Sequence, residues 1–185
     1  MANGRLGWNA TNAFNVLFYV GMILFIVGFS CPAWSYNESA YYSQYAGLWS
    51  CKESSYCSLI MYGKPTAAQA LECVALVAHI LSAVGVAFFY YVLYHSNGSN
   101  SYYDLVLKID GMLAILGGVF GIVGGIVYSS YIGGFTYTTD RLGWASILTI
   151  AASVFTSLVG SGLVLLSIPR FKNRLNGKYE VIPSH

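Results

Sequence analysis

The sequence predicts an all-α membrane protein: a left-handed bundle of four transmembrane helices with a small extracellular antiparallel β-sheet. Composition is the first observation, since only 9% of the 185 residues are charged and 56% are hydrophobic, whereas soluble domains carry about 25% charged residues. The second is the clustering of those charges, which leaves four long windows without any. The third is a polar stretch with two cysteines, residues 46–57, which predicts the sheet.

The four windows without Asp, Glu, Lys or Arg run over residues 6–37, 73–103, 111–139 and 142–169. Each exceeds the length of about 20 apolar residues that a helix needs to cross a bilayer. Buried helices of a soluble domain are the alternative, but they would need polar faces that these windows lack. The predicted transmembrane helices are therefore 13–33, 71–94, 109–129 and 144–168.

Basic residues predict the orientation of these helices. Six of them fall on the side that carries both termini, against three on the other side; the six are Arg5, Lys108, Arg170, Lys172, Arg174 and Lys178. Because Lys and Arg accumulate in cytoplasmic segments, both termini and the tail 169–185 are expected in the cytoplasm, with loops 34–70 and 130–143 outside. The net charge of +2 then reflects a basic tail beside anionic lipid rather than nucleic-acid binding. No small-x-small cleavage motif follows the first helix, so we expect it to remain as an anchor.

Cys51 and Cys57 lie in the first outer loop, where an oxidising environment favours a disulfide between them. Residues 45–51 alternate as a strand would, which places Trp49 and Cys51 on one face and lets Cys57 return across a hairpin. A zinc site is the alternative, but its remaining ligands are missing, since the histidines lie in a helix or in the cytoplasm. We expect Trp34 and Trp49 to seat the sheet on the helix ends.

Cys31 and Cys73 lie at similar depth near the outer helix ends. They could form a second bridge, but free, buried cysteines are the more common arrangement and the favoured one here.

Small residues mark one face of the third helix, where Gly117, Gly121 and Gly125 recur every four positions. Such a face permits close helix packing in lipid. Packing within the chain's own bundle is favoured over dimerisation.

Ionisable residues are sparse within the predicted helices. Glu72 is expected to reach the membrane interface, and His79 to form hydrogen bonds inside the bundle without a carboxylate near it. No CxxC, HExxH or phosphate-binding loop occurs. We therefore expect no enzyme activity, catalytic residue, metal site or cofactor, and no ion pathway.

Asn37-Glu38-Ser39 is a glycosylation sequon in the first outer loop. Asn9 and Asn97 begin equivalent sequons but are cytoplasmic in the predicted topology, so they should not be glycosylated.

Pro32-Ala33-Trp34, Gly47-Leu48-Trp49 and the two cysteines Cys51 and Cys57 together resemble the W…GLW…C…C pattern of the claudin superfamily. This superfamily includes the claudins, the peripheral myelin and epithelial membrane proteins, and the calcium-channel gamma subunits. The similarity extends over most of the chain, through residues 67–71 and Arg141-Leu142-Gly143-Trp144. Gln69 stands where claudins carry an arginine, and the first loop is shorter, so the chain resembles a divergent member.

The resemblance implies a protein of the plasma membrane at tight or septate cell junctions, with membrane lipid around it. Copies of the chain or related four-span proteins would associate side by side and head to head through the outer loops, with Phe135 and Tyr137 contributing to adhesion. The charges of the first loop cancel, which favours a paracellular barrier over a charge-selective channel. An auxiliary subunit of a channel or receptor is the alternative function, and a sugar on Asn37 would be typical of it.

Overall fold

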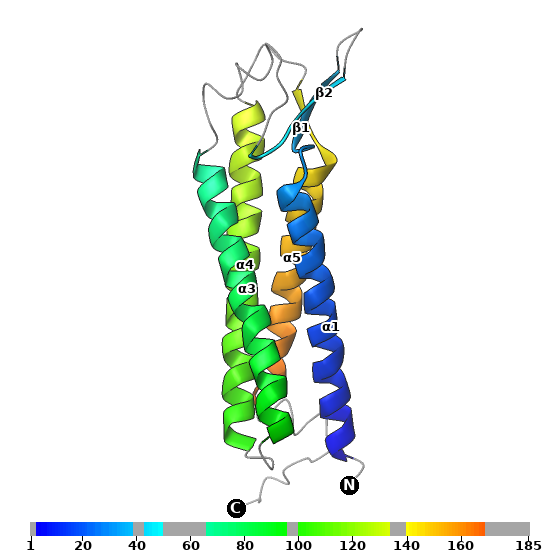
Figure 1. Ribbon diagram of the computed structural model, residues 1–185, viewed down its shortest axis with the longest axis vertical. Coiled ribbons are helices and arrows are strands. Elements are labelled where there is room, and N and C mark those ends of the chain that lie inside the picture. Colours follow the sequence, from blue (N-terminus) through cyan, green and yellow to red (C-terminus); the bar gives the residue numbers. More distant parts are fainter. Residues whose placement is uncertain (1–2, 39–42, 50–65, 96–99, 134–139, 169–185) are drawn as a thin grey trace, which may run out of the picture.

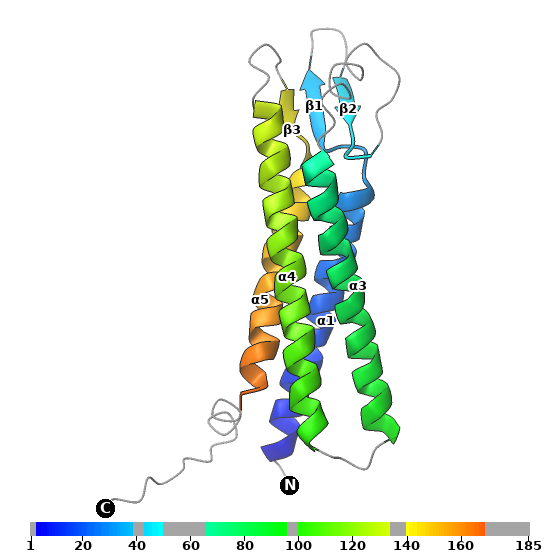
Figure 2. The same ribbon diagram turned by 90° about the vertical axis from the view of Figure 1, so that its left-hand side faces the viewer.

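The computed structural model describes residues 3–38, 43–49, 66–95, 100–133 and 140–168. These segments form four helices and three strands, in the order α1 (Asn3–Ser30), β1 (Ser35–Glu38), β2 (Ser43–Ala46), α3 (Thr66–His95), α4 (Asn100–Gly133), β3 (Asp140–Leu142) and α5 (Trp144–Leu166). The helices lie roughly parallel in one elongated bundle, and the strands lie at one end of it (Figures 1 and 2). We call this the sheet end and the opposite one the far end.

All four helices contain a segment long and apolar enough to cross a membrane, which confirms the predicted multi-pass architecture. Large apolar side chains are exposed on the outer faces of every helix, including Val16, Val77, Val123 and Leu158. A soluble bundle would bury such side chains, whereas lipid accepts them. The outer faces are therefore suited to a lipid environment.

The helix ends differ from the predicted ones. Helix α1 ends at Ser30 rather than at residue 33, because Pro32 has no N–H with which to continue the helical hydrogen bonds. Helix α3 begins five residues before the predicted start, and α4 extends beyond both ends of the predicted 109–129 segment. Charged and polar residues at these ends hide the true helix starts from a search for charge-free windows.

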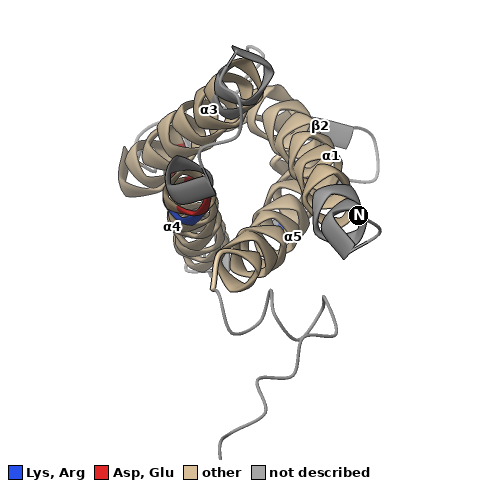
Figure 3. Cartoon of the chain, turned by 90° about the horizontal axis from the view of Figure 1, so that it is seen from below, with Lys and Arg blue, Asp and Glu red and all other residues tan. Residues whose placement is uncertain are grey.

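Helix α4 packs against α3 on one side and α5 on the other, and α1 packs against α5. Helices α1 and α3 complete the ring of helices seen along the bundle (Figure 3), and their contact is much smaller than the others. The glycines of α4 allow both close approaches: Gly117 and Gly124 face α3, while Gly118 and Gly125 face α5. Gly121 lies against Ser153 and Phe25. These glycine faces are thus occupied by helices of the same chain.

The sheet joins strands from both segments that connect helices at the sheet end. Its strand order is β2-β1-β3, and both pairings are antiparallel. Ser35 of β1 is paired with Ala46 of β2 and with Leu142 of β3. The predicted antiparallel sheet is confirmed, but the strand predicted over residues 45–51 ends at Ala46, and the chain bends at Leu48 and Trp49.

Candidate functional site

Trp34 is the centre of a buried cluster that fastens the sheet to the helices. We call it the anchor cluster, and its buried members are Ala33, Trp34, Leu48, Ala68, Tyr128, Ile132 and Ala145. The Trp34 ring meets the Tyr128 ring edge to face, with centroids 5.0 Å apart. Its Nε1–H donates to the Gly28 carbonyl at 2.8 Å. In a continuing helix that carbonyl would accept from residue 32, which is a proline, so the indole supplies the missing donor.

The backbone of Trp34 links three elements. Its N–H donates to the Ala46 carbonyl at 2.9 Å, and its carbonyl accepts from the Gly143 N–H at 2.7 Å. The neighbouring Ala33 carbonyl accepts from the Ala145 N–H at 3.1 Å. The end of α1, the end of β2 and the start of α5 are therefore held at one point.

Gly143 has no room for a side chain, because a Cβ there would overlap the Ala33 carbonyl oxygen. Gly143→Ala is therefore expected to lower the free energy of unfolding by about 1–3 kcal/mol, the usual cost of overpacking. Thermal unfolding in detergent measures this effect. Ala151→Ser also adds one heavy atom, but at an exposed position of α5, and should leave stability unchanged. An equal effect of the two substitutions would contradict the prediction.

The Gly47-Leu48-Trp49 motif contributes through Leu48 more than through its tryptophan. The Leu48 side chain is buried in the anchor cluster, and its carbonyl accepts from Gln69 Nε2 at 2.7 Å. Trp49 is 43% exposed and leans on Phe29, with ring centroids 5.2 Å apart. Gly47 is half-buried between the strand and the bend. Trp34 thus seats the sheet, whereas Trp49 lies at its margin.

Several predicted site residues lie outside the described residues: Cys51, Cys57, Phe135 and Tyr137. Their disulfide and adhesive roles stay predictions. Asn37 lies in the central strand β1, paired with Gln44 and Asp140. Cys31 and Cys73 are both free, as favoured, but neither is buried as expected, since Cys31 is half-buried and Cys73 is exposed.

Glu72 does not reach the membrane interface as predicted. It is 0% exposed, and a Cβ on Gly124 of α4 would lie 2.7 Å from its Oε1. Neither carboxylate oxygen has a hydrogen-bond partner among the described residues. The prediction was wrong because α3 begins at Thr66, which places Glu72 in the second turn, on the same helix face as buried Ala68, Ala75 and His79.

His79 contacts all three other helices. Its ring stacks on Phe25 and Phe18 of α1 at centroid distances of 4.9 and 6.1 Å, and Gly117 of α4 lies against it. Nδ1 lies 2.7 Å from the Ala75 carbonyl, and Nε2 lies 3.0 Å from Thr156 Oγ1 on α5. Because a carbonyl only accepts, Nδ1 carries a hydrogen. The Thr156 hydroxyl that lies beside Nε2 also donates to the Ser153 carbonyl at 3.1 Å, so His79 is joined to α5 through a short polar chain.

Asp110 also lies inside the bundle, contrary to the expectation that His79 has no acidic companion there. It is 2% exposed, and a Cβ on Gly85 of α3 would overlap its Oδ1. Ser82 Oγ donates to its backbone carbonyl at 3.1 Å, while its Oδ2 has no hydrogen-bond partner in the described part of the chain. Since α4 begins at Asn100 rather than near 109, Asp110 is ten residues inside the helix.

Three titratable side chains therefore recur along the contact of α3 with α4, and we call them the titratable seam: Glu72, His79 and Asp110. Each lies opposite a glycine of the other helix, in the pairs Glu72–Gly124, His79–Gly117 and Asp110–Gly85. The α4 members of these pairs are Asp110, Gly117 and Gly124. They are seven residues apart, which is the repeat of left-handed helix packing. The seven-residue spacing of Glu72 and His79 was the available sequence signal for this arrangement.

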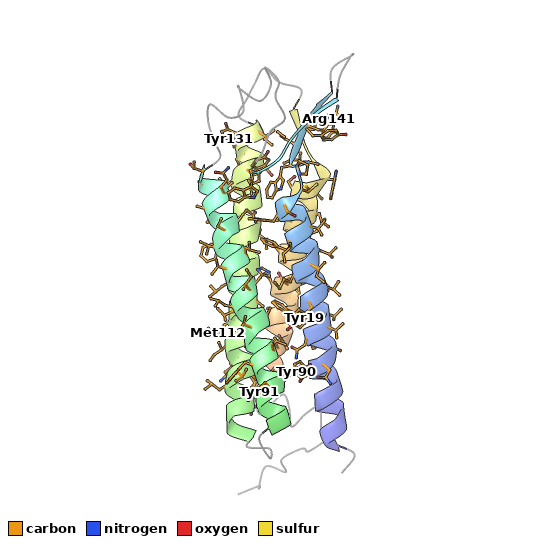
Figure 4. All side chains as sticks on the ribbon, in the orientation of Figure 1. Tyr19, Tyr90, Tyr91, Met112, Tyr131 and Arg141 are labelled. Carbon is orange, nitrogen blue, oxygen red and sulfur yellow. The ribbon has the colours of Figure 1, made fainter. Side chains whose placement is uncertain are left out.

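Polar groups also connect α1 with α3 in the far half of the molecule, where Figure 4 labels Tyr19 and Tyr90. The Tyr19 hydroxyl donates to the Ala83 carbonyl at 3.1 Å. The Tyr90 hydroxyl donates to Asn12 Oδ1 at 2.8 Å and accepts from Asn15 Nδ2 at 3.2 Å. Hydrogen bonds thus supplement the small contact between these two helices.

Among the described residues, no three metal-ligating side chains of the types His, Cys, Asp and Glu lie together. No protein-family model matches the chain, and no curated protein matches it.

Proposed function

We propose that this chain is a plasma-membrane protein of cell–cell junctions that forms adhesive contacts and a paracellular barrier through its sheet end. The observation that carries the proposal is the sheet itself, which joins strands from both segments connecting helices at that end. Trp34 and Gly143 fasten this sheet to the helices. A surface held in this way loses little conformational freedom when it binds a partner.

Aromatic and basic side chains at the sheet end suit such a contact. Tyr45 and Trp49 are about half exposed, and Arg141 of β3 is exposed next to the same strands (Figure 4). Tyrosine, tryptophan and arginine are enriched in protein interfaces, where they provide large contact areas. The excess of basic residues in the sequence before the first span, before the third span and after the fourth supports a topology with both termini in the cytoplasm and the sheet outside. The claudin-like motif around Trp34 and Trp49 supports the same function.

A cell-mixing assay tests this proposal. Tagged protein is expressed in cells without junctions, and its enrichment is compared between contacts of two expressing cells and contacts with non-expressing neighbours. We expect enrichment only where both cells express the protein. The double variant Tyr45→Ser/Trp49→Ala should reach the surface normally but lose the enrichment, while Val77→Ala, on the lipid-facing surface of α3, should retain it.

Uniform surface distribution of the unchanged protein would contradict homotypic adhesion. It would instead favour the second function, an auxiliary subunit that contacts a channel or receptor in its own membrane. Loss of enrichment in Val77→Ala as well would show that the contact does not depend on the sheet surface.

A further inference from the structure

We propose that Glu72 and Asp110 are two separate proton-binding sites inside the bundle, reached from opposite ends and divided by a layer around His79. This inference rests on the membrane-spanning bundle and not on the proposed junctional function. Its ligand is the proton, which needs no cavity beyond the carboxyl group that binds it.

The burial of both carboxyl groups is the first argument. Both oxygens of Glu72 and Oδ2 of Asp110 are buried without a hydrogen-bond partner among the described residues. An ionised carboxylate taken from water into such surroundings costs far more than a neutral acid, so a buried carboxyl without a cation binds a proton instead. Membrane interiors tolerate acidic side chains mainly where they pair or exchange protons.

Among the side chains that the structure describes, no lysine or arginine is buried beside either acid. In the half of α3 and α4 that contains Glu72, the described titratable groups are Cys73 and His79 of α3 and Tyr128 and Tyr131 of α4. Around Asp110 they are Tyr19 of α1, Tyr90 of α3, and Asp104 and Lys108 of α4, and the lysine is exposed. The spans Ala10–Ser30 and Trp144–Leu166 contain no Asp, Glu, Lys, Arg or His. Among the side chains that the structure describes, no cation accompanies either acid, and a proton supplies the positive charge in this proposal.

The layer around His79 separates the two sites. The His79 ring stacks against Phe18 and Phe25 and is hydrogen-bonded to Thr156. Gly117 of α4 also lies against the ring. Gly117 is seven residues from Asp110 and seven from Gly124, about 10 Å along the helix in each direction. The Nδ1–H of His79 points at the Ala75 carbonyl, and a backbone carbonyl cannot relay a proton. The structure thus favours two sites with separate access over one continuous pathway.

Each site is closest to a different end of the bundle. Glu72 is six residues from the start of α3, which is about 9 Å along the helix from its end nearest the sheet. Asp110 is ten residues from the start of α4, about 15 Å from the far end. Glu72 should therefore exchange protons with the sheet side, and Asp110 with the far side.

A membrane-permeant carbodiimide tests this arrangement in the full-length protein. The acid oxygen bonds to the central carbon of the reagent while its proton moves to a reagent nitrogen, so that only a protonated carboxyl adds. Labelling is measured at each residue by peptide mass spectrometry. Intact cells are compared with inside-out vesicles, and the pH is varied only in the outer medium.

We expect both residues to be labelled at acidic pH on both sides. Raising the outer pH of intact cells should reduce labelling at one residue only, by about tenfold per pH unit once that carboxyl ionises. In inside-out vesicles the other residue should respond. Glu72→Gln and Asp110→Asn should each remove their own label and leave the other one unchanged.

Three results would overturn the proposal: no labelling of either residue at acidic pH, labelling that ignores pH on both sides, or a response of both residues to the same side. The measurements need no junctional contact. Failure of the mixing assay and failure of this proposal can therefore be told apart.

Discussion

Trp34→Ala is expected to detach the sheet from the helices and to lower the free energy of unfolding by about 3–5 kcal/mol, the range for truncating a buried large aromatic side chain. The substitution removes the edge-to-face contact with Tyr128 and the filling of the anchor cluster. It also leaves the Gly28 carbonyl without its indole donor. Strand β1 begins at the next residue, so the loss falls directly on the sheet.

Thermal unfolding in detergent, together with limited proteolysis at the sheet end, measures this effect. Trp34→Phe keeps an aromatic ring but lacks the N–H. Apart from the effect of the smaller ring on packing, the lost hydrogen bond should lower the free energy of unfolding by about 0.5–1.5 kcal/mol. Trp49→Ala is the matched control, because that ring is already half exposed, and it should cost much less than Trp34→Ala. If both tryptophan truncations cost the same, Trp34 would not be the residue that seats the sheet.

The second large effect is expected at the centre of the titratable seam. A Cβ on Gly117 would overlap the His79 imidazole, which cannot move aside because two hydrogen bonds and two phenylalanine rings hold it. Gly117→Ala should therefore cost about 1–3 kcal/mol through overpacking. His79→Ala should lower the free energy of unfolding by about 2–5 kcal/mol, because it leaves an unfilled space among four helices and removes the hydrogen bond to Thr156.

A double-mutant cycle distinguishes this direct contact from two independent defects. In Gly117→Ala/His79→Ala the added methyl group enters space that the imidazole has left, so the combined loss should fall short of the sum by about 0.5–3 kcal/mol. Val123→Ala, on the exposed face of α4, should combine additively with His79→Ala. Additive losses in the Gly117 cycle would contradict the packing of His79 against α4.

The number of helices could be predicted from the sequence because membrane insertion depends on a local property. A window of sufficient length without charges needs no knowledge of its neighbours to be identified. A role for Trp34 in seating the sheet was expected from the amphipathic character of its ring, but the same role was expected of Trp49. The bond from the Trp34 indole to the Gly28 carbonyl, which distinguishes the two, depends on the folded end of α1.

Strand β3 could not be predicted in this way. Its three residues, Asp140–Leu142, have no alternation of their own that favours a strand. They form one because β1 offers an unpaired edge, and that edge exists only once the two segments meet above the helices.

The positions of Glu72 and Asp110 show the same limit more clearly. By sequence, both acids border a charge-free window; Glu72 was expected to reach the membrane interface, and no role was predicted for Asp110, which falls at the start of the predicted 109–129 helix. The structure decides otherwise, since the helices begin earlier and turn both acids toward the contact of α3 with α4, each opposite a glycine. Sequence by itself determined which segments are helices and how many there are. Which way a side chain at a helix end faces depends on the rotation of that helix against its neighbours, and only the packed bundle fixes that rotation.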